Sequence, residues 1–380
     1  MKIPVVIEPD YHHSIWCERT VLGINAEIGK KKYDLLLIDG DAYQSFDYET
    51  LFAGAERLLI VIGTSVSWIP RALAFFESSK IQVILVSYQP PEYTQLRGVV
   101  RMDYVSAMHK LITYLKACRR PRIALYGFNP NSSADRIKQR YFCSLAQKEG
   151  DDAPDSHVYH NYASLAQCYD GFRPYVSQYD AVICANDIVA VSLVKRLQRS
   201  GIRVPEALFV TCFGDSMLSQ FVSPGITTAS LDHVEMGRQA VALYSHLYRQ
   251  PEAVSSSIRV ESRLLVRRST MEMPPPNDYA ILTSASEPTD AVDFYSDEEV
   301  KRLCVIDSLI SSCDELDRDI LSGILAGKTY EAMAEMLSTT TSTLRYRLRR
   351  MLGAAGLDSR EALAKLFQQY IPGFPQNSDG

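Results

Sequence analysis

The stretch AVICANDIVAVSLVKRLQRSG, residues 181–201, contains one complete unit of the fold. An apolar strand is predicted at Ala181–Cys184, and an amphipathic helix is predicted over Ile188–Gly201 after a polar turn. A strand with few charges that ends in a polar residue is typical of a parallel sheet covered on both faces. The stretch therefore predicts one strand–helix repeat of an α/β protein.

The same alternation extends outward in both directions, over residues 3–270. Further strands are predicted at Ile3–Ile7, Leu35–Ile38, Leu58–Ile62, Val83–Val86, Arg122–Tyr126 and Leu208–Cys212. Further helices are predicted at Thr20–Lys31, Val105–Cys118 and Arg136–Lys148. So many elements indicate two parallel sheets with right-handed crossovers, and a ligand cleft between two lobes.

The composition is that of an ordinary globular protein of several domains. The chain has 380 residues, 46% of them apolar and 22% charged, with a net charge of -5. No apolar run reaches the ~18 residues of a membrane span, and the first residues lack the pattern of a signal peptide. We therefore expect a cytoplasmic protein without membrane contact. The eight cysteines are scattered, which predicts neither disulfides nor a metal site, and no cofactor is expected.

The composition changes after Thr270. Residues 271–300 contain acids and no Lys or Arg, and three prolines follow one another at 274–276. This predicts an acidic linker over 271–296 that separates an effector-binding domain, 1–270, from the rest. Ser296 and Glu299 have the spacing of a capping box, which predicts a connecting helix over 297–312.

The last module, residues 313–371, is predicted to be helical, with a tail over 372–380. A short helix opened by Thr329, a turn and a helix over Thr341–Leu352 have the arrangement of a helix-turn-helix. The last of these helices is basic, and hydroxyl side chains cluster at its amino end, so it can meet phosphates and base edges. The predicted DNA contacts are Thr340, Thr341, Ser342, Thr343, Arg345, Tyr346, Arg347, Arg349 and Arg350. The alternative is a solvated helix whose arginines pair with nearby acids.

Several motifs of this module resemble the LuxR/FixJ-type helix-turn-helix. They are Asp317-Arg318-Asp319-Ile320-Leu321, Gly327, Ala334, Leu337, Thr343-Leu344-Arg345 and Ser359-Arg360-Glu361-Ala362. The resemblance implies that Arg345 and Arg347 meet DNA. Ala354-Ala355 and Met333 depart from the family pattern, outside the predicted recognition helix.

A second series of motifs resembles the effector-binding core of LacI/GalR-type regulators, including the branch related to the xylose regulator. In order, they are Ala185-Asn186-Asp187, Gly201–Glu206, Cys212–Asp215, Pro224–Thr228, Met236–Ala240 and Leu264–Thr270. The resemblance implies two lobes joined by three crossovers, with a small sugar or nucleobase bound between them. Those regulators carry their DNA-binding headpiece before the core, and we expect the carboxy-terminal module to replace it here.

The candidate effector contacts lie at strand ends or at positions that the resemblance implies. They are Asp10, Tyr11, His13, Thr64, Arg136, Asn186, Phe213, Asp215 and Asp232. Arg136 resembles the family's ligand-clamping arginine, and Gly214 stands where the family has a sugar-binding Asp. Asn186 is either a ligand contact or a helix cap, and Asp187 is expected mainly to cap.

These features together predict a ligand-responsive transcriptional regulator, a homodimer that binds an inverted-repeat DNA site. The chain has no GxGxxG after the first strand, no P-loop and no GxSxG, so an enzyme is not expected. The main alternative is a small-molecule sensor whose last domain binds a protein partner and not DNA.

Overall fold

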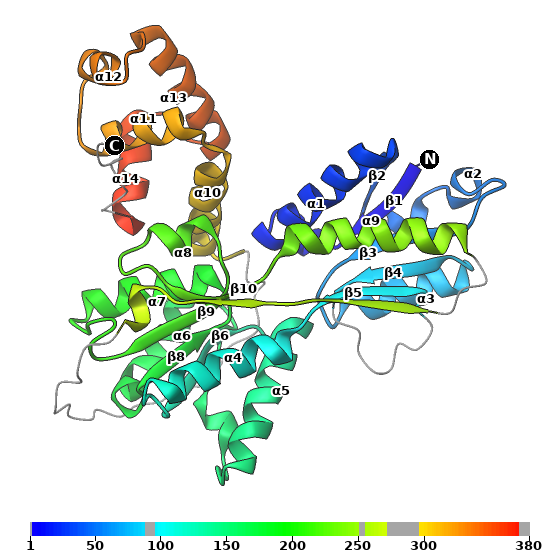
Figure 1. Ribbon diagram of the computed structural model, residues 1–380, viewed down its shortest axis with the longest axis horizontal. Coiled ribbons are helices and arrows are strands. Elements are labelled where there is room, and N and C mark those ends of the chain that lie inside the picture. Colours follow the sequence, from blue (N-terminus) through cyan, green and yellow to red (C-terminus); the bar gives the residue numbers. More distant parts are fainter. Residues whose placement is uncertain (1, 88–95, 251–254, 272–295, 372–380) are drawn as a thin grey trace. The chain divides into compact units, whose positions relative to one another are not determined.

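The computed structural model describes residues 2–87, 96–250, 255–271 and 296–371 (Figure 1). The chain forms two compact units, one from residues 1–114, 128–162 and 229–264, the other from 115–127, 163–228 and 265–380; we call them unit 1 and unit 2. The predicted linker, apart from its end residues 271 and 296, and the predicted tail lie outside the described residues. The predicted domain boundaries therefore stay predictions.

Two six-stranded sheets form the α/β core, as the strand–helix alternation predicts. The first has the order β11-β5-β4-β3-β1-β2, and the second has the order β12-β10-β9-β8-β6-β7. The chain passes from one sheet to the other three times, after β5, β10 and β11. The strands of the first sheet are β1 Lys2–Ile7, β2 Asp34–Asp39, β3 Leu58–Ile62, β4 Gln82–Val86, β5 Gly98–Met102 and β11 Ser256–Val260. Those of the second are β6 Ile123–Phe128, β7 Val158–His160, β8 Ala181–Cys184, β9 Phe209–Gly214, β10 Thr227–Ser230 and β12 Arg263–Leu265.

Helices follow most of the strands. The α-helices of the core are α1 Ile15–Lys31, α2 Tyr48–Leu51, α3 Trp68–Ser78, α4 Tyr104–Ala117, α5 Ser133–Lys148, α6 Leu165–Phe172, α7 Asp187–Arg199, α8 Met217–Phe221 and α9 His233–Arg249. Short 3-10 turns lie at Pro9–Tyr11, Tyr43–Ser45, Pro154–His157, Arg173–Gln178 and Arg268–Thr270. The four core helices predicted from periodicity are all present, with shifted ends.

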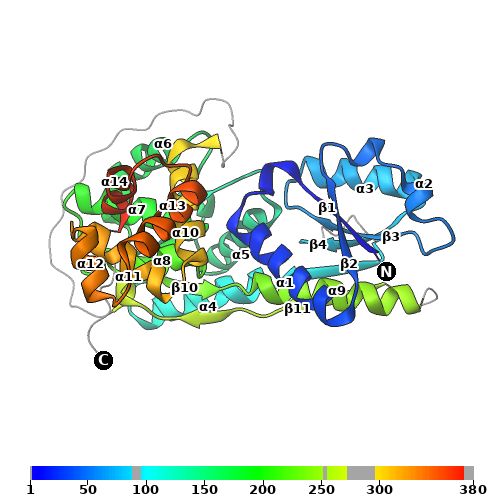
Figure 2. The ribbon, with the colours of Figure 1, turned by 90° about the horizontal axis from the view of Figure 1, so that it is seen from above.

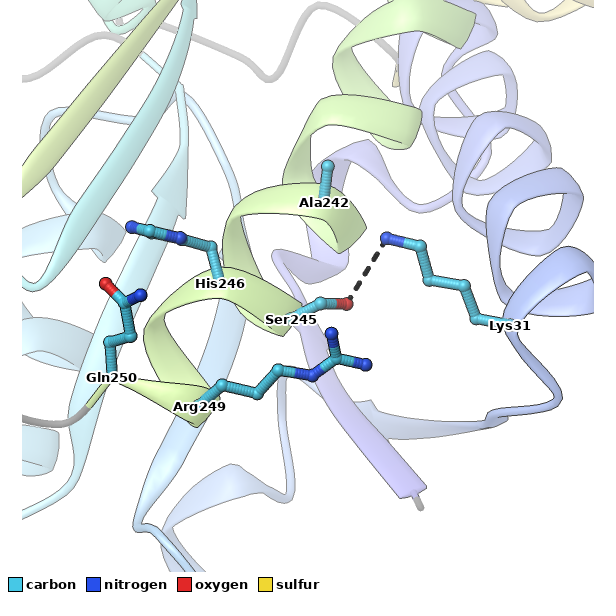
Figure 3. A pocket seen from close by; sticks show the side chains of 6 residues that line it. All are labelled: Lys31, Ala242, Ser245, His246, Arg249 and Gln250. Atoms are coloured by element: carbon cyan, nitrogen blue, oxygen red, sulfur yellow. Dashed lines mark hydrogen bonds between the residues drawn. The ribbon is translucent and has the colours of Figure 1, made fainter.

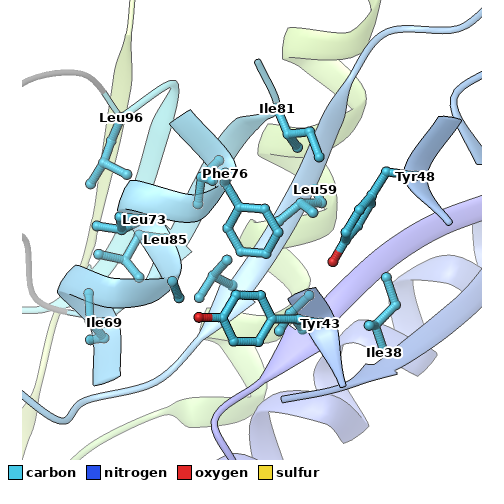
Figure 4. Close-up of a cluster of buried hydrophobic side chains, with 14 of the residues drawn as sticks. Ile38, Tyr43, Tyr48, Leu59, Ile69, Leu73, Phe76, Ile81, Leu85 and Leu96 are labelled. Carbon is cyan, nitrogen blue, oxygen red and sulfur yellow. The ribbon is translucent and has the colours of Figure 1, made fainter. Parts of the chain in front are cut away.

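The inner strands β1, β3 and β4 of the first sheet are buried on both faces. On one face, alternate residues of the strands, such as Val6, Leu59 and Val61, pack with aromatic side chains of α3 and the turn before it (Figure 4). This alternation is that expected of a strand whose side chains point to opposite faces.

Helices α1 and α9 cross at very short range in unit 1. A Cβ on Gly23 would lie 1.9 Å from the Val234 carbonyl oxygen, and one on Gly237 would lie 2.0 Å from the Thr20 oxygen. Any other residue at either position would force the helices apart.

The carboxy-terminal helices belong to unit 2. They are α10 Glu298–Ser312, α11 Glu315–Leu325, α12 Tyr330–Met336, α13 Thr341–Ala355 and α14 Arg360–Tyr370. The cap of α10 is Asp297, not the predicted Ser296, because the Asp297 carboxylate accepts the Glu299 N–H. Gly353 lies inside α13, and the left-handed Gly356 ends that helix.

Candidate functional site

A buried carboxylate joins the ends of two neighbouring strands in unit 1. Glu8 directly follows β1, and its Oε2 accepts hydrogen bonds from the backbone N–H groups of Thr64 at 2.7 Å and Ser65 at 3.1 Å. Its Oε1 is buried and has no hydrogen-bond partner among the described residues. Burial raises the pKa of Glu8, and hydrogen bonds from Thr64 and Ser65 oppose the shift.

Thr64, a predicted effector contact, connects Glu8 to the start of α5. Its hydroxyl lies 3.1 Å from the Ser133 Oγ and 3.4 Å from the Ser132 Oγ, and its carbonyl accepts the Ser133 N–H at 2.9 Å. Ser132 in turn caps α5. Hydroxyls that both donate and accept can exchange partners, which suits a site for a polar small molecule.

Helix α5 carries the predicted effector contact Arg136 and a buried cation, Lys138. Arg136 is exposed, and its Nε donates to the Pro130 carbonyl at 2.6 Å. Lys138 is only 3% exposed, and its Nζ lies 2.6 Å from Asp135 Oδ1. The Lys138 ammonium also lies over the ring of Phe128, at 5.4 Å. Lys138 and Asp135 therefore extend the polar network that begins at Glu8.

Of the other predicted contacts of unit 1, Tyr11 lies next to this network, because its N–H donates to the Glu8 carbonyl at 3.2 Å. Asp10 and His13 are exposed, whereas Tyr11 is buried against Trp16, with 6.0 Å between ring centroids. Asp232 caps α9 by accepting the Glu235 N–H at 2.9 Å.

In unit 2 the predicted contacts serve local structure. Asn186 caps α7, since its Oδ1 accepts the Val189 N–H at 3.0 Å, so only its amide nitrogen is left to meet a ligand. Phe213 is 1% exposed. The Asp215 carboxylate lies 2.5 Å from the Arg267 guanidinium. Asp187, expected mainly to cap, is the first residue of α7 and not its cap; it is buried and accepts the N–H groups of Asp215 and Ser216, each at 3.2 Å.

A hollow of about 300 Å³ lies between the carboxyl ends of α1 and α9 in unit 1 (Figure 3). It is lined by Lys31, Ala242, Ser245, His246, Arg249 and Gln250, and it contains none of the predicted effector residues. Cationic side chains at helix carboxyl ends are favoured by the helix dipole alone. The hollow therefore does not by itself indicate a ligand.

The second candidate site is helix α13. Thr340 caps it, and its hydroxyl lies 2.8 Å from Ser342 Oγ and 3.0 Å from Thr343 Oγ1. Ser342, Arg345, Tyr346 and Arg349 are exposed at the spacing of one helical face, and Tyr346 is 68% exposed. Thr341 and Thr343 are half-buried.

Two of the four predicted arginines pair with acids instead. Arg347 lies 2.6 Å from Asp314 and 2.9 Å from Asp317, and Arg350 also pairs with Asp317. The Asp317 carboxylate is fully buried, and the hydrogen bond from Arg347 lowers the pKa of Asp314. The alternative, in which the arginines pair with nearby acids, thus holds for Arg347 and Arg350. Arg345 and Arg349 are the two predicted DNA-contacting arginines outside these pairs.

The remaining arginines differ in their surroundings. The Arg345 guanidinium lies over the ring of Tyr330, 5.3 Å from its centroid, where a cation–π contact restrains it. No hydrogen bond or ion pair is recorded for Arg349 among the described residues, and its side chain is exposed.

Residues 112–270 match the family of the periplasmic binding protein-like domain. The chain is 28% identical over 275 residues to the NTD biosynthesis operon regulator NtdR of Bacillus subtilis (strain 168), covering 69% of this chain and 80% of NtdR. These comparisons relate the α/β core to periplasmic binding protein-like domains and to NtdR. NtdR is a regulator by name and not an enzyme, in agreement with the expectation from the sequence.

Two solved structures share the fold of this core. Transcription regulator CcpA of Lactococcus lactis superposes with a TM-score of 0.59 at 18% identity, over 71% of this chain and 100% of that one. A LacI family transcriptional regulator from Enterococcus faecium with bound ribose superposes with a TM-score of 0.57 at 18% identity, over 73% and 100% of the two chains.

Candidate membrane spans and metal clusters are both absent from the described residues. None of the helices within those residues has the length and apolarity needed to cross a membrane. In the same part of the chain, no group of three His, Cys, Asp or Glu side chains is arranged to hold a metal ion.

Proposed function

We propose that this chain is a ligand-responsive, cytoplasmic regulator of transcription, in which a small polar effector bound to the LacI/GalR-type core controls DNA binding by α13. The observation that carries the proposal is the exposed face of α13, which joins hydroxyl, guanidinium and phenol groups on a helix that follows a tight turn. A helix of this kind enters the major groove by its amino-terminal half.

Arg345 and Arg349 are the arginines that we assign to DNA. They are exposed and lie four residues apart, so they face the same groove. Arg347 and Arg350 hold α13 against the start of α11 through Asp314 and Asp317. They fix the orientation of the helix, and they contribute less to phosphate binding because acids already neutralise them.

The effector that we propose is a sugar or a related polyol. The network Glu8–Thr64–Ser133 and the neighbouring Lys138–Asp135 pair offer the mixture of donors and acceptors that hydroxyl groups require. The ribose-bound regulator of similar fold supports this class of ligand. The position of the effector between two lobes stays a prediction.

We further propose a homodimer, since one helix-turn-helix covers a single half-site and a two-fold dimer reads an inverted repeat. A second candidate function is a sensor whose carboxy-terminal helices bind a protein. It is favoured by the exposed Met336 and Tyr346, which are 48% and 68% exposed.

The decisive experiment is selection of bound duplexes from a random DNA pool by the full chain. We expect an enriched inverted repeat for the wild type, and its loss in the Arg345→Ala/Arg349→Ala variant. A single base-reading arginine should contribute about 1–3 kcal/mol of discrimination at one base pair, whereas a phosphate contact should lower the salt slope by about 1. Lys365→Ala, which removes an exposed charge on α14, is the matched control and should leave the motif unchanged. If the wild type enriches no motif with or without sugars, the protein-binding sensor is favoured.

A further inference from the structure

The segment from Gly214 to Leu218 in unit 2 is held between two buried carboxylates. Asp187, at the start of α7, accepts the N–H groups of Asp215 and Ser216, each at 3.2 Å. Asp307, in the middle of α10, accepts the N–H of Leu218 at 2.8 Å. Asp187 is 7% exposed and Asp307 is 1% exposed. The backbone N–H groups of three residues in this segment are thus fixed from opposite ends by side chains of two different helices.

The packing at the Asp187 end leaves no room for a larger residue. A Cβ on Gly214 would lie 1.9 Å from Asp187 Oδ2, and Gly214 has a φ of +132°. The Asp187 carboxylate therefore occupies the space that a side chain at position 214 would need. The same end of the segment carries two residues predicted to meet an effector, Phe213 and Asp215, and Asn186 directly precedes Asp187.

Helix α10 is anchored to the effector-binding core by more than Asp307. Its cap residue Asp297 accepts the Leu165 N–H at 2.8 Å, and Glu299 forms an ion pair with Arg196 at 2.5 Å and accepts the Ser192 hydroxyl at 2.9 Å. The apolar face of α10 is buried, with Leu303 and Ile306 fully inaccessible to solvent.

The same helix contacts the proposed DNA-binding helices. It packs against α7 and α8 as well as against α13 and α14, and both views of unit 2 draw it next to α8 and α13 (Figures 1 and 2). Just after α10, the Cys313 Sγ lies 3.9 Å from the Met351 Sδ of α13. A displacement of α10 therefore cannot leave α13 unaffected.

We propose that Asp307 is a positioning residue that couples the segment 214–218, and with it the candidate effector residues, to the orientation of α13. That this coupling links effector binding to DNA binding rests on the proposed function. The mechanical link itself rests only on the contacts given above. A ligand that moves Phe213 or Asp215 moves backbone whose N–H groups are fixed by Asp187 and Asp307. Because both carboxylates are buried, releasing either bond leaves an uncompensated polar group, so the segment and α10 move together. Coupling between two sites requires a structural element whose position both sites influence, and α10 is that element here.

The test uses the full chain and perturbs the Asp187 end while the response is read at α13. The perturbation is Asp187→Ala, with Asp187→Asn as a second variant should the first fail to fold. Each is made in the wild-type background, in Asp307→Ala, and in Asp307→Asn, which keeps an acceptor oxygen. Glu299→Gln is the matched control, because it breaks another contact of α10 and leaves the segment untouched.

Hydrogen–deuterium exchange gives a readout that needs neither effector nor DNA. We expect the Asp187 variants to speed amide exchange in 215–218 and also in α10 and α13. In Asp307→Ala the acceleration should remain in 215–218 and vanish from α13, while Asp307→Asn and Glu299→Gln should preserve it. An α13 response that persists in Asp307→Ala, or that is absent in the wild-type background, overturns the proposal.

The second readout is affinity for a labelled duplex that carries the motif enriched from the random pool. We expect an Asp187 variant to change this affinity by about 5-fold or more, the lower end of allosteric couplings, and Asp307→Ala to abolish the change. An unchanged affinity in the Asp187 variant contradicts the coupling alone. If the wild type enriches no motif, the proposed function fails, and the exchange measurement still decides the coupling.

Discussion

The two units bury charged groups in different ways. In unit 1, Lys138 and Asp135 form an ion pair of 2.6 Å, and the hydroxyl groups around Thr64 face one another. In unit 2, Asp187 and Asp307 are buried; Asp187 accepts two backbone N–H groups and the Cys212 thiol, and Asp307 accepts the Leu218 N–H. The Lys138–Asp135 pair thus joins two side chains, whereas Asp187 and Asp307 hold main chain, as Glu8 does in unit 1 through the Thr64 and Ser65 N–H groups.

This difference separates two tasks. Side chains that pair with side chains can change rotamer and admit a ligand in place of a partner, at the cost of one hydrogen bond for another. A carboxylate bound to backbone N–H groups cannot release them without moving the chain. The Lys138–Asp135 pair and the hydroxyl groups around Thr64 therefore have the character of a binding site, and Asp187 and Asp307 that of groups that transmit a displacement.

The largest effect should come from separating the ion pair of unit 1. Lys138→Met leaves Asp135 buried without its cation, which should lower the free energy of unfolding by about 3–5 kcal/mol, as measured by urea denaturation. Arg136→Ala is the matched control, because Arg136 is exposed, and we expect a change within about 0.5 kcal/mol. If Lys138→Met and Arg136→Ala lowered the free energy of unfolding equally, the claim that the buried ion pair stabilises unit 1 would be contradicted.

Particular strands and side chains show what the sequence can and cannot predict. The apolar run Ala181–Cys184 specified its strand, whereas β5 contains Arg101 and β10 consists of small and hydroxyl residues, so neither has a continuous apolar run. The family resemblance implies a ligand contact at Arg136, which is exposed, and it does not indicate that Lys138 is buried. Lys138 lies three residues after Asp135 and four before the buried Phe142, and this spacing was the available signal. Sequence could not show that Arg347 and Arg350 pair with Asp314 and Asp317, because that depends on how α11 and α13 pack.

A change of pH should act on the two units with opposite signs. In unit 1, burial lowers the pKa of His233 from 6.5 to about 3, helped by the charges of Arg19 and Lys138. In unit 2, burial raises the pKa of Asp187 from 3.8 to about 6. His233 is therefore held neutral, and its contribution is lost as the pH falls below 6.5. Asp187 prefers its protonated form in the folded state, so its contribution is lost as the pH rises through about 6.

Between pH 7 and pH 5 the His233 effect should destabilise the protein by about 2 kcal/mol, and the Asp187 effect should stabilise it by about 1 kcal/mol. We would measure unfolding free energies of the wild type, His233→Asn and Asp187→Asn at both pH values. Relative to the wild type, His233→Asn should lose less stability on acidification and Asp187→Asn should lose more. If both variants changed the pH dependence of the unfolding free energy in the same direction, the opposite pKa shifts given for His233 and Asp187 would be contradicted.

The smallest effect concerns single hydroxyl groups. Thr64→Val in unit 1 removes a hydroxyl whose neighbours, Ser132 and Ser133, are themselves hydroxyls that can rotate to new partners. Thr228→Val in unit 2 removes the hydroxyl that donates to the Cys212 carbonyl at 3.2 Å, and a carbonyl in a strand cannot turn to another donor. Both threonines are buried, so the two substitutions are matched in shape and in surroundings. We expect a loss below about 1 kcal/mol for Thr64→Val and about 1–2 kcal/mol for Thr228→Val, from denaturant midpoints at constant slope. The test is which variant loses more stability. A larger loss in Thr64→Val than in Thr228→Val would mean that the hydroxyl network around Thr64 is as rigid as the backbone contacts of unit 2.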